Sequence, residues 1–214
     1  MMKEYDDYRI LICSPHTDDG ELTAGGTIAK LREMGAEVYY VAFSCCEDSV
    51  PKEYECHILR SECIRAMKIL GIPESHLMFK NYSVRSFHNF RQKILDDLLD
   101  LQRIISPNLI ITPSSYDVHQ DHQVIHMESI RAFKKTASII GMEHPWNNLS
   151  FKSDVAVPLT EAHVEKKLAA LHEYHSQSSR KYFDETYIRA LAQTRGLNIN
   201  ADYAETFECI RVIF

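Results

Sequence analysis

The chain has 214 residues, of which 45% are hydrophobic and 25% are charged, and its formal net charge is −6. This composition is typical of a folded domain with a sizeable core and excludes a disordered chain. Lys and Arg residues are scattered along this acidic sequence, which argues against nucleic acid or an anionic membrane surface as a partner.

Three features predict a cytoplasmic location. The first residues, Met-Met-Lys-Glu-Tyr-Asp-Asp, are polar and acidic, unlike a signal peptide. No apolar run approaches the roughly 20 residues that a transmembrane helix needs, so we expect no transmembrane segment. The six cysteines include the adjacent pair Cys45-Cys46 but no CxxC pair, which favours reduced thiols over a disulfide framework.

Apolar runs that predict strands alternate with stretches of helical spacing. In chain order we expect a strand at 8–13, a helix at 21–34, a strand at 38–43, a helix at 54–70, a strand at 77–79, a helix at 90–105, a strand at 108–112, a helix at 120–138, a strand at 155–157, helices at 160–175 and 180–195, and a strand at 206–213.

Alternation of strands and helices over residues 8–138 predicts a parallel sheet with right-handed crossovers. We therefore expect a Rossmann-like α/β fold, in which an open, mostly parallel sheet is flanked by helices and followed by a C-terminal α/β extension. The sequence shows no internal repeat or linker, so a single domain is expected over residues 1–214, with a core at about 1–138 and the extension at about 139–214.

An imidazole and three carboxylates fall within six residues, His16-Thr17-Asp18-Asp19-Gly20-Glu21, directly after the first predicted strand. Such turns at the carboxyl ends of parallel strands are where open α/β sheets place their sites. His16 and Asp19 can bind one metal ion together, which leaves Asp18 free to move a proton. The turn therefore resembles half of a catalytic metal site.

A second acid–imidazole cluster, His119-Gln120-Asp121-His122, follows the strand predicted at 108–112. Because parallel strands place such junctions on one edge of the sheet, the two clusters are expected to meet. His16, Asp19 and His122 then supply three ligands and leave one position open, which is the pattern of a catalytic zinc. The same ligand types also bind Fe²⁺ or another divalent metal.

Simpler interpretations compete with this one. Asp and Ser near helix starts often serve only as caps. His122 and His126 have the spacing of the HExxH zinc motif, but position 123 is Gln, so we interpret His126 as a surface or packing residue. Four further histidines have no acidic partner at ligand spacing and are assigned solvated or structural roles: His57, His76, His88 and His163.

At these two clusters the chain resembles the PIG-L / LmbE-like family of zinc-dependent N-deacetylases. The family motif HPDDxE corresponds to His16–Glu21, with Thr17 in place of the usual Pro, and HxDH corresponds to His119–His122. Cys45-Cys46-Glu47 stands where many members have a Gly-bearing segment. Weaker similarities extend over most of the chain, at Arg60-Ser61-Glu62, Leu70-Gly71, Ser176-Gln177, Arg195-Gly196 and Tyr203-Ala204-Glu205-Thr206-Phe207.

The resemblance implies that His16, Asp19 and His122 bind zinc, that Asp18 is the general base and that His119 stabilises the oxyanion. Asp121 is expected to orient a flanking imidazole, with a plain helix N-cap as the alternative. The implied reaction removes the N-acetyl group from an N-acetylglucosamine-type amino sugar or its glycoside and releases acetate.

Substrate contacts are assigned by analogy. Arg60 would hold sugar hydroxyls or an anionic aglycone, and Trp146 would stack on a sugar face, although a surface role and a packing role are the respective alternatives. Tyr116 is a further candidate, and weaker ones are Asp117, Arg85, Gln177 and Arg195. The partner is therefore a small-molecule amino sugar or glycoconjugate, and the resemblance is compatible with a homo-oligomer.

Two other classes of function stay open at this point. A metal-dependent esterase or phosphoesterase on a small sugar-like substrate would use the same activated water, and a non-catalytic protein would only bind the metal. Nucleotide binding is disfavoured, because Gly25-Gly26 lacks the GxGxxG spacing and follows acidic residues that repel phosphate.

Overall fold

A computed structural model describes residues 7–213 of the chain. Residues 1–6, on which the prediction about a signal peptide depends, lie outside the described residues. The strands and α-helices are, in order, β1 Arg9–Ser14, α1 Asp19–Glu33, β2 Glu37–Ala42, α2 Ile58–Ile69, β3 Leu77–Phe79, α3 Arg91–Ile105, β4 Leu109–Pro113, α4 Gln120–Phe133, β5 Ser138–Met142, β6 Val155–Leu159, α5 Glu161–Leu171, α6 Glu185–Leu197 and β7 Tyr203–Arg211.

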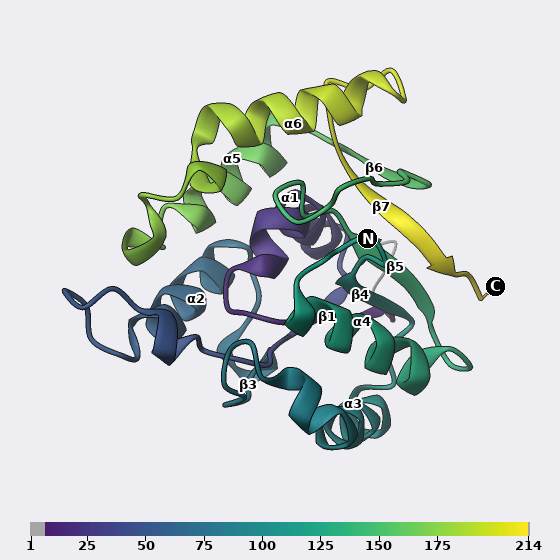
Figure 1. Cartoon of the computed structure of the whole chain (residues 1–214). Coiled ribbons are helices and arrows are strands. Elements are labelled where there is room, and N and C mark those ends of the chain that lie inside the picture. The colour runs from purple at the N-terminus through teal and green to yellow at the C-terminus, as the bar shows by residue number, and fades with distance from the viewer. Residues whose placement is uncertain (1–6, 214) are drawn as a thin grey trace.

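The seven strands form one sheet in the order β3-β2-β1-β4-β5-β7-β6 (Figure 1). Strands β3, β2, β1, β4 and β5 are parallel, and β7 runs antiparallel to both β5 and β6. The chain moves outward from β1 to β3 and then returns to β4, so β1 and β4 flank the switch point where such sheets bind ligands. The predicted Rossmann-like fold is confirmed.

Helices cover both faces of the sheet, with α3 and α4 on one side and α1, α2, α5 and α6 on the other (Figure 1). Strand β1 shows why: Ile10 and Ile12 pack into the core under α1 and α2, whereas Leu11 and Cys13 pack under α3 and α4. A strand that is buried on both faces is apolar at every position, which explains the continuous hydrophobic run seen in the sequence.

Several boundaries differ from those predicted. The helix expected at 120–138 ends at Phe133, and Ser138–Met142 forms the unpredicted strand β5, which pairs with β4. Helix α6 begins at Glu185 rather than near 180, because the side chain of Asp184 caps it by accepting the Tyr187 N–H at 3.0 Å. The last strand covers Tyr203–Arg211 rather than 206–213.

The C-terminal segment fixes the position of α1. The Glu205 carboxylate on β7 accepts the backbone N–H groups of Gly26 (3.0 Å) and Thr27 (2.7 Å), in the middle of that helix. Lys167 of α5 donates to the same carboxylate at 2.7 Å, and both side chains are buried. A Cβ atom at Gly26 would lie 2.5 Å from the Leu159 side chain, so a larger residue there would force Leu159 to move.

Over residues 7–213, no helix combines the length and the apolar character that crossing a membrane requires.

Candidate metal and catalytic site

The turn between β1 and α1 is stabilised from within. The Ser14 hydroxyl donates to the carbonyl oxygen of His16 at 2.6 Å and accepts the Gly20 N–H at 3.0 Å. A Cβ atom at Gly20 would lie 2.5 Å from the ring of Tyr40, so only glycine fits there. These contacts fix the direction in which His16 and Asp19 leave the turn.

The buried carboxyl group of Glu21 stabilises the same turn through two tyrosine hydroxyls. Glu21 is fully buried and accepts hydrogen bonds from the hydroxyls of Tyr40, at 2.6 Å, and Tyr174. Burial raises the pKa of Glu21 to about 8, although both hydroxyls lower it. Tyr174 also lies 2.6 Å from the carbonyl oxygen of Thr17. Glu21 therefore supports the turn and is not positioned as a metal ligand.

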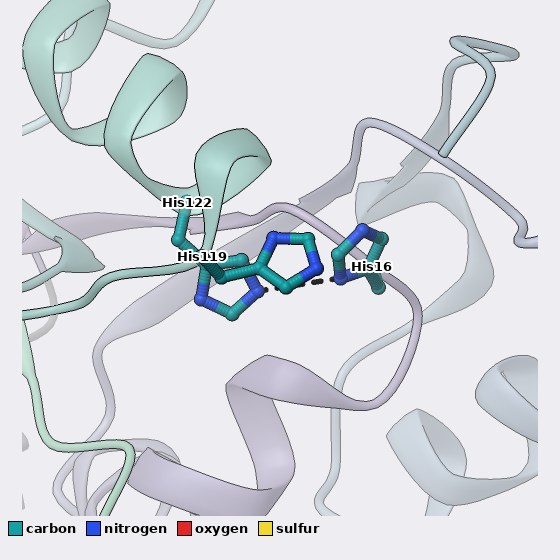
Figure 2. Close-up of side chains that lie close together, drawn as sticks. All are labelled: His16, His119 and His122. Atoms are coloured by element: carbon teal, nitrogen blue, oxygen red, sulfur yellow. Dashed lines mark hydrogen bonds between the residues drawn. The ribbon is translucent and has the colours of Figure 1, made fainter. Parts of the chain in front are cut away.

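The structure brings His16, Asp19 and His122 together as predicted. His16 Nδ1 lies 3.1 Å from Asp19 Oδ2, His122 Nε2 lies 3.2 Å from that oxygen, and the two nitrogens are 3.3 Å apart. Tetrahedral zinc with bonds of roughly 2.0 Å needs ligand atoms about 3.3 Å apart. The three atoms therefore have the spacing of three corners of a zinc tetrahedron. Figure 2 shows the short approach of the His16 and His122 rings.

Each of these imidazoles has its own carboxylate partner. Asp121 lies 3.2 Å from His16 Nε2, and Asp117 lies 2.7 Å from His122 Nδ1. Such contacts fix the tautomer and orientation of metal-binding histidines. The expected role of Asp121 toward a flanking imidazole agrees with this geometry, and the plain N-cap alternative does not, because His119 is the N-cap of α4.

Asp121 also binds the loop that precedes α3. Its carboxylate accepts the backbone N–H groups of Arg85 at 2.6 Å and Phe87 at 3.3 Å. Arg85 has a φ of 65°, a left-handed conformation that is rare outside glycine. The loop is therefore attached to the metal site through its main chain.

The electrostatics of the cluster favour cation binding. Burial lowers the pKa of both imidazoles, but the carboxylates outweigh it, and Asp19 above all raises the pKa of His16 to about 8 and that of His122 to about 10. Without a metal, the cluster therefore attracts protons. A divalent ion would replace those protons as the positive charge.

Asp18 is adjacent in sequence to the candidate ligand Asp19 but differs in its environment. It is the N-cap residue of α1, yet its side chain makes no capping hydrogen bond, and the carboxylate lines a cavity. Burial, followed by the neighbouring charge of Asp19, raises the pKa of Asp18 to about 6. A carboxyl group with a pKa near neutrality is suited to accept and release a proton.

His119 lies beside the metal cluster at the start of α4, with its ring centroid 5.1 Å from that of His16 (Figure 2). Its Nδ1 atom accepts the Asp121 N–H at 3.2 Å, so in the neutral ring the proton is on Nε2. Burial and the nearby charges of His122 and His16 lower the pKa of His119 to about 4. The ring is thus a neutral hydrogen-bond donor.

The cavity in front of the cluster has a volume of about 510 Å³. One wall is aromatic: the rings of Trp146 and Tyr182 stack with centroids 4.5 Å apart, and Arg180 donates to the Tyr182 hydroxyl at 2.6 Å. The other lining residues are His16, Asp18, Asp19, Leu22, Cys46, Asp48, Ser49, Leu59, Val84, Arg85, His119, His122, Asn147 and Gln177.

Two of the three residues assigned to substrate binding are not in this lining. The Arg60 guanidinium lies 4.9 Å from the centroid of the Phe79 ring, and Tyr116 packs against Phe151. Trp146 does line the cavity. Among the weaker candidates, Arg85 and Gln177 line the cavity. Asp117 does not line it and instead contacts His122 Nδ1, and Arg195 donates to Glu143 at 3.0 Å.

His126, considered as an alternative ligand, is buried, and its Nδ1 lies 2.8 Å from the carbonyl oxygen of Pro113. This contact agrees with a packing role.

Sequence reasoning missed His144, Arg180 and Tyr182. His144 is fully buried beside Asp19 and Asp117. Like the other two clusters, Glu143-His144 places an acid and an imidazole directly after a strand, but that strand, β5, was not predicted. Arg180 and Tyr182 lie on a connection between helices, where no motif marks them.

The fold and site together define a Rossmann-like α/β protein with a one-metal candidate site at its switch point. The chain belongs to the PIG-L family, whose sequence description, GlcNAc-PI de-N-acetylase, matches residues 11–133. The predicted family is thereby confirmed.

Relatives of the chain carry deacetylase names. It is 29% identical over 170 residues to the "Uncharacterized deacetylase YaiS" of Escherichia coli strain K12, covering 78% of this chain and 90% of that protein. It is 24% identical over 230 residues to a diacetylchitobiose deacetylase of Thermococcus kodakarensis, covering 96% and 84%. A solved N,N'-diacetylchitobiose deacetylase from Pyrococcus horikoshii, bound to an inhibitor, superimposes with a TM-score of 0.79 at 22% identity, covering 98% and 85%.

Proposed function

We propose that the protein is a zinc-dependent N-deacetylase that removes the acetyl group from an N-acetylglucosamine-type amino sugar or its glycoside and releases acetate. One observation carries this proposal: Asp18 and His119 line the same cavity as the His16–Asp19–His122 cluster. A metal cluster accompanied by a carboxylate of raised pKa and a neutral donor is equipped for amide hydrolysis.

The residues present fit a catalytic metal. Two imidazoles and one carboxylate have the right spacing, and the imidazole rings are oriented by Asp121 and Asp117. When bound, a divalent ion polarises the acetyl carbonyl and lowers the pKa of a water molecule to about 7. The donor set suits zinc, and Fe²⁺ is the alternative to be compared in reconstitution.

Asp18 is the general base in this proposal. As a carboxylate it takes a proton from the attacking water, and as a carboxylic acid it returns that proton to the leaving amine nitrogen. General acid–base catalysis typically contributes about 10²–10⁴-fold to the rate. Its pKa of about 6 makes both protonation states accessible near neutral pH.

His119 stabilises the charge that develops on the acetyl oxygen. Its Nδ1 is occupied by the Asp121 N–H, so the Nε2–H group is the donor. A donor fixed before the reaction begins stabilises the oxyanion without reorganisation during the reaction. Because the low pKa keeps the ring neutral, His119 acts through a hydrogen bond rather than as an acid.

The cavity suits a sugar. Trp146 and Tyr182 present an aromatic surface, and Arg180 and Gln177 add hydrogen-bond donors near it. We propose Trp146, Tyr182 and Arg180 as substrate contacts in place of Arg60 and Tyr116, which lie outside the lining. The name of the Thermococcus relative, a diacetylchitobiose deacetylase, supports an N-acetylated sugar as substrate.

The test is acetate release by zinc-loaded protein from free, lipid-linked, nucleotide-linked and small-molecule-linked N-acetylglucosamine. Acetate esters and phosphoesters of similar size serve as competing substrates. We expect acetate from at least one N-acetylated sugar and no phosphate release. Turnover of esters or phosphoesters with none of any amide would contradict the proposal in favour of an esterase or phosphoesterase.

A further inference from the structure

His144 is a buried imidazole without a hydrogen bond. It follows β5, its side chain is 0% exposed, and neither ring nitrogen has a hydrogen-bond partner among the described residues. Buried polar groups in proteins are almost always paired. Nδ1 lies 3.1 Å from Asp117 Oδ2, whereas Nε2 is 3.6 Å from Asp19 Oδ1, so Nε2 is the nitrogen that still requires a partner.

The ring lies against the metal cluster. Its Nε2 lies 3.6 Å from Asp19 Oδ1, and its centroid lies 4.7 Å from that of His122. Asp19, His122 and His144 each offer a ligand atom, these atoms all lie within 4.8 Å of one another, and all three residues are buried. His144 is not among the residues that line the cavity.

We propose that His144 is a metal ligand, so that Asp19, His122 and His144 form an inner metal position next to the outer position formed by His16, Asp19 and His122. The proposal rests on the metal site of the proposed function and adds a ligand to it. A metal ion bound to Nε2 supplies the partner that this nitrogen lacks, and Nδ1–H is then directed at the Asp117 carboxylate, 3.1 Å away.

The two positions hold one ion between them. His122 uses Nδ1 to bind Asp117 at 2.7 Å, so only its Nε2 is free to bind a metal, and one lone pair binds one ion. Asp19 serves both positions, because Oδ2 lies near His16 while Oδ1 faces His144. Because His16 lines the cavity and His144 does not, an ion in the outer position would lie closer to the cavity than an ion in the inner position.

The proposal predicts that the metal survives the loss of His16. We expect His16→Asn to retain about one Co²⁺ per chain, bound more weakly, because Asp19, His122 and His144 remain. The double variant His16→Asn/His144→Asn should bind none. The matched control is His16→Asn/His126→Asn, since His126 is also a buried histidine but is bonded to a backbone carbonyl.

Binding is measured by dialysis with metal analysis and by competition with a chromophoric chelator, after circular dichroism has shown that each variant is folded. NMR of Co²⁺-loaded protein with ¹⁵N-labelled histidine then identifies the imidazoles that bind the ion in either position. We expect paramagnetic shifts of the rings of His16, His122 and His144 in the wild type, and of His16 and His122 alone in His144→Gln. Metal retention in the His16→Asn/His144→Asn variant equal to that in its control, or no metal in His16→Asn, would overturn the proposal.

The readout is metal binding and not acetate release. A protein that loses its metal in the double variant but hydrolyses no amide would refute the proposed function and leave the inner position standing. A protein that hydrolyses amides but binds its metal without any contribution from His144 would refute the inner position and leave the proposed function standing.

Discussion

Asp18 and Asp19 are consecutive carboxylates with opposite properties. Burial by itself would raise the pKa of Asp19, but the charges of His122 and His16 hold it well below its usual range. Asp18 lacks such close cationic partners, and burial together with Asp19 raises its pKa to about 6. This separation of the two pKa values suits the proposed roles of Asp19 as metal ligand and Asp18 as base.

We predict that Asp18→Asn retains the metal and loses about 10²–10⁴-fold in kcat, because the amide cannot accept the proton. Acetate release and metal content are measured on the same preparation. Asp48→Asn is the matched control, since Asp48 lines the same cavity and, among the described residues, forms no hydrogen bond or ion pair with His16, Asp19 or His122. Wild-type turnover in Asp18→Asn would exclude Asp18 as the base.

Metal binding should release protons. The metal-free pKa values are about 8 for His16 and about 10 for His122, so both rings are protonated at pH 7 and must be deprotonated to bind. We expect about two protons released per ion at pH 7 and about one at pH 9, and weaker binding as the pH falls. Calorimetry in buffers of different ionisation enthalpy measures this number, and a release near zero at pH 7 would contradict the prediction.

At the scale of elements, the functional groups follow one rule: they lie directly after the parallel strands. His16 follows β1, His119 and His122 follow β4, and His144 follows β5. The sequence predicted the first two clusters because the apolar runs before them were recognisable. It missed the third because the residues that follow α4, Lys134-Lys135-Thr136, contain no glycine or proline stop signal, so the predicted helix extended into β5.

Side-chain partners were harder to predict than ligands. The HxDH pattern pointed to Asp121, but the contact between Asp117 and His122 depends on how the loop after β4 folds back on α4. The assignment of Arg60 failed for a similar reason. Its place on α2 is visible in the sequence, but the direction of its side chain, toward Phe79, is set by packing.

Helix α1 should depend on its contact with the C-terminal segment. Glu205→Ala leaves the buried Lys167 without a counter-charge and removes the carboxylate that two N–H groups of α1 contact, so we expect a loss of about 3–5 kcal/mol in the free energy of unfolding. Glu205→Ala/Lys167→Ala should lose less than the sum of the single variants.

Urea unfolding measures these changes. Glu165→Ala, which removes an exposed partner of Arg189, is the control and should cost less than about 1 kcal/mol. A cost for Glu205→Ala no larger than that of this control would show that the contact does not stabilise α1.

At the scale of the whole molecule, one sheet joins two proposed ligands that are 106 residues apart in sequence, His16 and His122. The unfolded chain holds no such cluster, so a metal bound there should stabilise the folded state. At a free metal concentration 100 times the Kd, this linkage adds about 2.7 kcal/mol. For a protein of this length the expected rise in Tm is roughly 5–11 °C.

Thermal unfolding with zinc and with a chelator tests this prediction. His122→Ala should show no difference between the two conditions, because His122 belongs to both proposed metal positions. His126→Ala, a change on the same helix, should keep the difference. An equal metal-dependent shift in His122→Ala would place the stabilising ion elsewhere.

The contact between Asp121 and the loop before α3 bears on how the substrate preference of this protein can change. Asp121 accepts hydrogen bonds from the main-chain N–H groups of Arg85 and Phe87, so these bonds do not depend on which side chain occupies position 85. Evolution or design can therefore vary that side chain while the orientation of His16 is preserved. Glycine and asparagine would enter most readily, because they tolerate the left-handed backbone found at Arg85.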